Sequence, residues 1–143
     1  CEMIAQAMEI EVSRPELPEG VGEKDVLAEG ALFAQANEVV PAVADPFARS
    51  RAKDVATLVA CMDRKRRYGA AVDAIEVDEI GALLGQKPKD AVDAVRAIDE
   101  AIRARKIPDE KIVPYLTRRA YREEWLYAPC VELYPARNWS ALD

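Results

Sequence analysis

Four acidic residues are the first candidates for chemistry in this sequence, because they lie within one short stretch. Asp73, Glu76, Asp78 and Glu79 could bind a divalent cation or act as an acid and base pair. However, the chain contains no His, which is the commonest general base and metal ligand. It also has no Asp-x-Asp-x-Asp-Gly loop of the calcium-binding type. We therefore interpret Glu76 and Glu79 as part of a solvated helix face.

The three cysteines, Cys1, Cys61 and Cys130, are the second group of reactive side chains. They are far apart, odd in number and without the Cys-x-x-Cys spacing of a zinc site, so no metal site is expected. Cys61 lies inside a predicted helix, where a small buried apolar side chain is the favoured interpretation. Unpaired thiols also fit a reducing compartment better than a secretory one.

Two basic runs, Arg64–Arg67 and Arg118–Arg119, could contact phosphate or lipid head groups. Each run also lies late in a predicted helix, where positive charge is favourable against the helix dipole, and this second interpretation is favoured. Gly20-Val-Gly22 lacks the glycine and lysine that complete a phosphate-binding loop. The net charge of −6 argues against a general nucleic-acid-binding protein. The sequence therefore predicts no catalytic residues, no cofactor and no nucleic-acid partner.

Aromatic residues gather near the C-terminal end of the chain, which holds both tryptophans. Trp and Tyr are enriched at the energetic centres of protein interfaces. The segment 128–143 contains two prolines and no helical period, so it cannot form a core of its own. It must fold back on the chain or dock on a partner, and both alternatives stay open. The candidate partner-binding residues are Trp125, Tyr127, Leu133, Tyr134 and Trp139.

The elements that position these residues are expected to be helices. Half of the residues are hydrophobic, but only 6% are aromatic and much of the apolar content is Ala. Chains rich in Ala, Glu, Lys and Arg favour helices. No apolar run approaches the length of a membrane span. The periodicity of the apolar residues predicts helices over 23–40, 47–68, 71–84, 88–106 and 108–125.

Proline and glycine predict where these helices begin and end. Pro41 should end the first helix, and Asp45 before Pro46 has the order of an N-cap followed by Pro at the first helical position. Gly69 is a plausible C-cap of the next helix. Residues 1–13 could form a helical turn or an extended arm. We expect an N-terminal arm over 1–22, a helical-repeat domain over 23–127 and an extended tail over 128–143.

The last two predicted helices are joined tightly at Pro108, so they should pack antiparallel as a helical hairpin. Val95 and Ile98 should be buried in that packing. The preceding stretch repeats the pattern at an offset of 36 residues, which aligns Lys53 with Lys89. A period of this size is typical of stacked helical-hairpin repeats. The predicted fold class is all-α, with antiparallel helix-hairpin repeats forming a short superhelix between extended N- and C-terminal arms.

The second hairpin carries two family resemblances. The segment 94–118 resembles the pentatricopeptide repeat, with the turn at Lys106-Ile-Pro-Asp-Glu110. Over about residues 92–122 the chain also resembles subunit Va of mitochondrial cytochrome c oxidase, an all-helical superhelix. The second resemblance rests on Val95-Arg96, Ile98-Asp99-Glu100, Pro108 and Lys111-Ile-Val-Pro-Tyr-Leu116.

These resemblances imply two different functions. Subunit Va is a non-catalytic accessory subunit without a prosthetic group, which packs on other protein subunits and supports assembly and stability. The resemblance to it implies a place in the respiratory chain, peripheral on the matrix side of the mitochondrial inner membrane. The pentatricopeptide resemblance implies the alternative of a helical-repeat module that binds RNA or a peptide. The negative charge and the small number of repeats stand against RNA. We therefore expect a protein-binding subunit rather than an enzyme.

Overall fold

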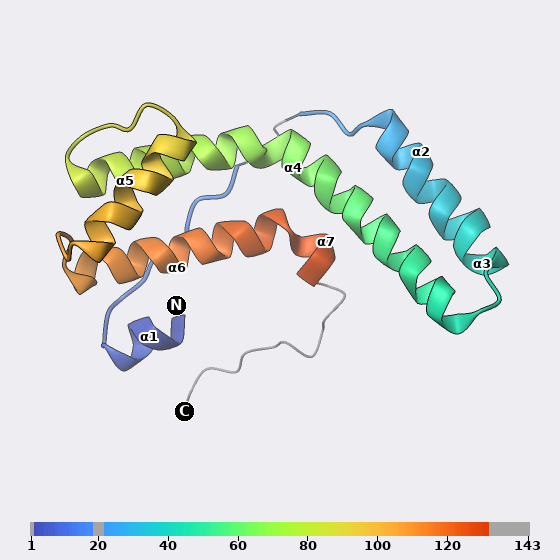
Figure 1. The fold of residues 1–143 in the computed structure, drawn as a ribbon, viewed down its shortest axis with the longest axis horizontal. Helices are drawn as coiled ribbons and strands as arrows, with labels where there is room; N and C mark the ends of the chain where they lie inside the picture. The colour runs from blue at the N-terminus through green and yellow to red at the C-terminus, as the bar shows by residue number, and fades with distance from the viewer. Residues whose placement is uncertain (1, 19–21, 132–143) are drawn as a thin grey trace. The chain divides into compact units, whose positions relative to one another are not determined.

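The protein is all-α in the computed structural model, which describes residues 2–18 and 22–131 and shows no strand among them (Figure 1). The described residues divide into two compact units, which share the long helix α4. Unit 1 takes 2–18 and 70–124, and unit 2 takes 22–69 and 125–131. The predicted fold class is therefore confirmed at the level of all-α structure.

Helix α4 is a single helix of 39 residues, Pro46–Leu84. It begins as the sequence predicts, because the Asp45 Oδ1 accepts a hydrogen bond of 2.7 Å from the Ala48 N–H, and Pro46 follows at the first helical position. It ends before Gly85, whose φ of +69° is the left-handed conformation of a C-cap glycine. The predicted C-cap at Gly69 is wrong, since α4 continues through it and its φ is not positive.

Because α4 is continuous, the prediction of two helical-hairpin repeats is wrong. The first predicted hairpin, formed by helices 47–68 and 71–84, requires a turn between residues 68 and 71, whereas the chain is helical there. Residues 53–80 are therefore one continuous run of helix, and only their counterparts at 89–116 contain a turn. The 36-residue offset in the sequence does not correspond to two helical hairpins.

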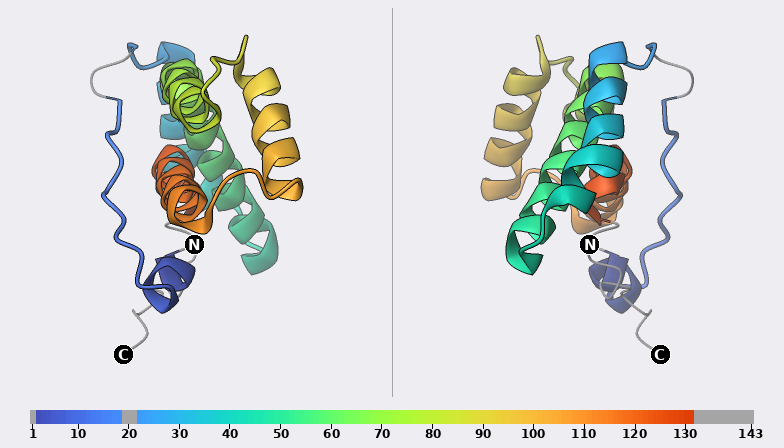
Figure 2. Two further views of the ribbon diagram at one scale, coloured as in Figure 1. Left: turned by 90° about the vertical axis from the view of Figure 1, so that its left-hand side faces the viewer. Right: turned by 90° about the vertical axis from the view of Figure 1, so that its right-hand side faces the viewer.

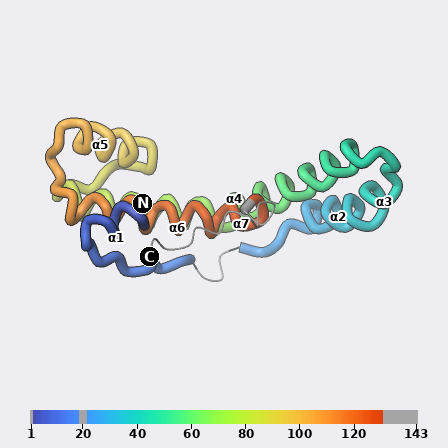
Figure 3. Tube along the Cα trace, turned by 90° about the horizontal axis from the view of Figure 1, so that it is seen from below, coloured from blue at the N-terminus to red at the C-terminus, as the bar shows by residue number. Residues whose placement is uncertain are grey.

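Unit 2 is built on the first part of α4. Helix α2 (Val26–Ala34) leads into the π-helical turn η1 (Gln35–Val39) and the short α3 (Val40–Ala42). The predicted end at Val40, before Pro41, is two residues early, because the wider π-turn before Pro41 lets the helix tolerate the missing N–H of this proline. Figures 1 and 3 show α2 antiparallel to α4, and the Gln35 side chain donates to the Ala52 carbonyl at 2.7 Å.

Unit 1 contains the predicted hairpin. Helix α5 (Ala91–Arg103) begins after Asp90, whose side chain accepts from the Asp93 N–H, and the chain then turns into α6 (Asp109–Leu126). Arg105 lies in the left-handed region at φ +51° within this turn. The Arg105 and Lys106 N–H groups donate to the carbonyls of Ile102 and Ala101, which is the hydrogen-bond pattern of a Schellman cap.

The core of unit 1 lies between α5, α6 and the last part of α4, which Figure 2 shows on three sides of it. The short helix α1 (Glu2–Ala7) and the following extended segment also pack on this core, so the helical turn expected as one alternative for residues 1–13 holds for α1. The buried core residues are Ala5, Ile80, Ala94, Ile98, Ile112, Val113 and Tyr115.

The C-terminal end of the described chain is also helical. Helix α7 (Ala128–Val131) belongs to unit 2, so the extended tail predicted from residue 128 is wrong for these four residues. A backbone hydrogen bond of 2.8 Å from the Cys130 N–H to the Tyr127 carbonyl closes its turn. The remainder of the predicted tail, 132–143, lies outside the described residues.

The two apolar residues expected in the hairpin interface differ in burial. Ile98 is buried at 2% exposure, as predicted, whereas the predicted burial of Val95 is wrong, since this side chain is 42% exposed. Ile98→Ala should lower the free energy of unfolding by about 2–4 kcal/mol, because it leaves a cavity in a packed core. Val92→Ala on the same helix, at 70% exposure, is the control and should change it by less than about 0.5 kcal/mol. Equal effects in denaturant unfolding would contradict this packing.

Candidate functional site

An open hollow of about 380 Å³ lies between α5 and α6 in unit 1. Its floor is formed by Ile98 and Tyr115, which are buried, and its rim by the exposed side chains of Val92, Val95 and Ile102. The charged residues of its lining are Arg96, Asp99 and Arg119. An apolar rim over a packed floor is the kind of surface on which a partner protein can bury its own apolar side chains.

A buried carboxylate holds the floor of this α5–α6 hollow in place. The Tyr115 hydroxyl donates to the Glu76 Oε1 at 2.6 Å, and the Arg119 Nε lies 3.1 Å from the same oxygen. Burial raises the pKa of Tyr115, and the hydrogen bond to the Glu76 carboxylate raises it further. Glu76 is 9% exposed, so the interpretation of Glu76 as part of a solvated face is wrong.

The other carboxylate of that predicted face, Glu79, is also paired. Its Oε1 accepts from the Arg118 Nε at 2.8 Å, and its Oε2 accepts from the Arg122 Nη2 at 2.6 Å. Arg122 is 1% exposed, and its Nε and Nη1 find no acceptor among the described residues. Much of the charge of Arg122 is therefore compensated by Glu79, so the interpretation of Glu79 as a solvated residue is also wrong.

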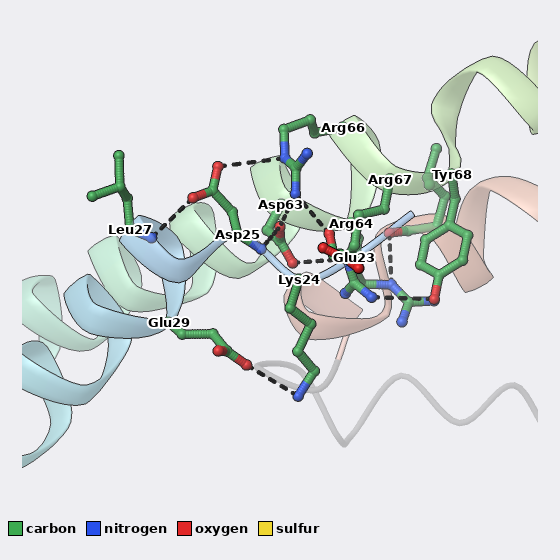
Figure 4. Close-up of polar contacts among 11 residues, drawn as sticks. Glu23, Lys24, Asp25, Leu27, Glu29, Asp63, Arg64, Arg66, Arg67 and Tyr68 are labelled. Carbon is green, nitrogen blue, oxygen red and sulfur yellow. Dashed lines mark hydrogen bonds and ion pairs between the residues drawn. The ribbon is translucent and has the colours of Figure 1, made fainter. Parts of the chain in front are cut away.

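Unit 2 has its own polar network, centred on Asp63 of α4 (Figure 4). The Asp63 carboxylate accepts from the Arg67 Nε at 2.9 Å, from Arg66 at 3.3 Å and from the Asp25 N–H at 3.4 Å. Burial by itself would raise the pKa of Asp63, but the N–H of Asp25 and the two guanidinium groups outweigh it and hold the pKa below its usual range. Asp25 in turn accepts from the Leu27 N–H and caps α2.

The three arginines of the basic run Arg64–Arg67 all form hydrogen bonds within unit 2. Because α4 continues past Gly69, these residues do not lie at the end of a helix, and the dipole interpretation does not apply. Arg64 instead donates to the carbonyls of Trp125 and Leu126 at 2.7 and 3.2 Å. An open hollow of about 390 Å³ lies beside them, between α2, α4 and Pro129, with Lys24, Glu29 and Leu32 in its lining.

The structure describes two of the five candidate partner-binding residues. The Trp125 ring packs edge-on against Tyr68 at 5.0 Å between centroids, and the Arg64 guanidinium lies 4.6 Å from the Trp125 ring centroid. Trp125 therefore folds back on α4, which is one of the two alternatives for this segment. Tyr127 is half-buried in the turn before α7. Leu133, Tyr134 and Trp139 lie outside the described residues.

Residues 2–18 and 22–131 offer neither a metal cluster nor a membrane-spanning helix. No group of three or more His, Cys, Asp or Glu side chains is arranged there to hold a metal ion. None of the helices in the same part of the chain has the length and apolar content needed to cross a bilayer. The candidate sites among the described residues are therefore the two hollows with their ion pairs and a pair of neighbouring cysteines.

The first prediction for the site concerns Glu79. Glu79→Gln should lower the free energy of unfolding by about 3 kcal/mol, because it leaves the buried Arg122 charge without a carboxylate. Glu123→Gln is the matched control on an exposed ion pair with Arg119, and it should cost less than about 1 kcal/mol. Urea unfolding of both variants measures the difference. A loss at Glu79 no larger than that at Glu123 would show that Arg122 does not depend on this carboxylate.

The second prediction concerns pH. Because the folded-state pKa of Asp63 is depressed, its contribution to stability is present above the unfolded pKa of about 3.9 and is lost as the pH falls through the folded value. Asp63→Asn should lower the free energy of unfolding by about 1–3 kcal/mol at pH 7. The difference in this free energy between the variant and the unsubstituted protein should become smaller below about pH 4. Asp99→Asn, in an exposed pair with Arg103, should show neither effect. A gap that stays constant from pH 7 to pH 3 would contradict this role of Asp63.

Comparison with protein-family models, with curated proteins and with solved structures gives no match to this chain.

Proposed function

We propose that this chain is a non-catalytic helical subunit that acts by binding other proteins through the α5–α6 hollow. The observation that carries the proposal is the apolar rim of that hollow. Val92 and Ile102 lie ten residues apart on α5, and Val95 lies between them, so the exposed apolar side chains run along the helix. Burying such a stripe against a partner would remove apolar surface from water, which is the main favourable term in protein association.

The partner complex we propose is mitochondrial cytochrome c oxidase, with the chain as a peripheral subunit on the matrix side of the inner membrane. The support is the resemblance to subunit Va over about residues 92–122. That stretch contains nearly all of α5, the turn at Pro108 and most of α6. Several residues that carry the resemblance also line the hollow, namely Val95, Arg96, Ile98, Asp99, Tyr115 and Leu116. In this role the chain would support assembly and stability of the oxidase.

The floor of the hollow suits a binding role because it is rigid. Tyr115 is held by Glu76, and Glu76 is held by Arg119, so the side chains beneath the rim are fixed before a partner arrives. A surface that is already ordered loses less conformational entropy on binding. We therefore expect the rim to supply most of the contact and the floor to keep its shape.

The experiment is purification of the oxidase from the source organism, followed by identification and quantification of its subunits. The proposal predicts this chain in stoichiometric amount with the other subunits. Its absence from the intact, active oxidase would overturn the assignment. Co-purification of RNA that persists at about 150 mM salt, and falls steeply with more salt, would favour the alternative of an RNA-binding repeat module.

Variants test whether α5 is the contact surface. Val92→Glu places an acidic residue in the first turn of α5, where the helix dipole tolerates it, but puts a charge on the rim. It should lower the recovery of the chain with the oxidase at least about tenfold, which corresponds to about 1.4 kcal/mol of binding free energy. Leu27→Glu, on α2 at 83% exposure, is the matched control and should leave recovery unchanged. Equal recovery of both variants would show that partners bind elsewhere.

A further inference from the structure

Two cysteines from distant parts of the sequence lie side by side in unit 2. Cys61 is on α4 and Cys130 is on α7, and their Sγ atoms are 2.6 Å apart. Both are free thiols in this structure. A disulfide bond has a length of about 2.05 Å, so very little movement separates the two thiols from a covalent bond.

The surrounding contacts hold the two thiols in this position. Arg64, less than one helical turn after Cys61, donates to the carbonyls of Trp125 and Leu126, just before α7. Tyr68, one turn further along α4, packs on the Trp125 ring. The Cys130 N–H is itself bonded to the Tyr127 carbonyl. The approach of the two sulfurs is therefore built into the packing of α4 against the end of α6 and the start of α7.

We propose that Cys61 and Cys130 form a reversible disulfide site, which is oxidised by a low-molecular-weight disulfide such as glutathione disulfide. This site does not depend on which protein the α5–α6 hollow binds. Two further observations fit the proposal. Cys130 is half-buried and so remains accessible, whereas Cys61 is 5% exposed and protected from other reagents. Burial also raises the pKa of Cys61 to about 11, which makes Cys130 the thiol that reacts first.

The reaction takes place as two exchanges. The Cys130 thiol loses its proton to water, and its sulfur attacks one sulfur of glutathione disulfide, breaking that bond and releasing one glutathione thiolate. The Cys61 thiol then loses its proton, and its sulfur attacks the Cys130 sulfur of the mixed disulfide, releasing the second glutathione. The two cysteines are oxidised by two electrons in total, and one glutathione disulfide is reduced to two glutathione molecules.

The bond would change how the start of α7 is held. In the reduced form the end of α6, just before α7, is held on α4 by the Arg64 hydrogen bonds and by the packing of Tyr68 on Trp125. In the oxidised form α7 would also be tied covalently at Cys61. Pro129, the neighbour of Cys130, forms part of the 390 Å³ hollow beside α2, so oxidation would fix one wall of that hollow.

The test uses the full chain carrying Cys1→Ser, which removes the third thiol. After incubation with glutathione disulfide, we expect loss of both remaining thiols, no bound glutathione by intact mass, and a Cys61–Cys130 cross-linked peptide in the digest. Reduced glutathione in excess should restore both thiols. Stable glutathione adducts without the cross-link, cross-links between two chains, or two thiols that survive the treatment would each overturn the proposal.

Two single variants in the same background complete the test. Cys61→Ser removes the second exchange, so it should accumulate one glutathione on Cys130. Cys130→Ser leaves only the buried thiol, and it should react at least about tenfold more slowly than Cys61→Ser, since access and thiolate fraction govern these rates. Far-UV circular dichroism matching the parent shows that both variants are folded. If either variant is unfolded, the cross-linked peptide from the chain that carries Cys1→Ser alone still decides whether Cys61 and Cys130 form a disulfide. Faster reaction of Cys130→Ser would contradict the proposed order of steps.

Discussion

The unbroken backbone of α4 is the constraint on which both units depend. Its residues 46–69 form a wall of unit 2, and its residues 70–84 form a wall of unit 1. The helices that pack on these walls are short, with 9 residues in α2 and 13 in α5. Isolated helices shorter than about 12–15 residues are marginal in water, so α5 depends on packing its buried Ala94 and Ile98 into the core that contains Ile80 of α4. A break at Gly69 would leave unit 1 with only the short helical stretch 70–84 as its wall.

Ion pairs within each unit determine how many basic residues of this protein remain free to bind an anionic partner. In unit 1, Glu76 and Glu79 of α4 bind the arginines of α6, and in unit 2, Asp63 binds Arg66 and Arg67. Pairs of this kind gain little net stability when they form, but removing one partner leaves a buried charge uncompensated. In the sequence, phosphate binding by the same arginines is the less favoured of two interpretations. Because they are paired within their own units, few of them are free for a nucleic-acid backbone, which agrees with the negative net charge.

The sequence predicts well those features that depend on neighbouring residues. The N-cap of α4 at Asp45, the turn at Pro108 and the burial of Ile98 follow from short patterns, and the structure confirms them. Gly69 was misjudged because a glycine alone does not end a helix. Ala70 and Ala71 follow it, and no proline does, so the cost of one glycine is about 1 kcal/mol, which the packing of α4 can outweigh. The repeat prediction failed with it.

The features that the sequence did not reveal join residues far apart in the chain. Glu76 and Glu79 meet arginines about 40 residues later, and Cys61 meets Cys130 after 69 residues. A partial signal existed for the carboxylates. Their spacing of three places them on one helix face, and Arg118 and Arg122, four residues apart, share a face of α6. No comparable signal existed for the cysteines, because a lone cysteine in a helix indicates only burial.

The proposed partner contact on α5 differs from the contact that the sequence favoured. The sequence favoured the aromatic residues after 124, yet Trp125 is already packed between Tyr68 and Arg64, so using it at an interface would first require breaking those contacts. The rim of the α5–α6 hollow has no such cost, because Val92, Val95 and Ile102 are exposed and stand over a floor held by Glu76. Apolar surface that is already exposed on an ordered helix gains the most from burial and loses the least entropy. On these physical grounds the α5 rim, rather than Trp125, is the better candidate for the first contact with a partner.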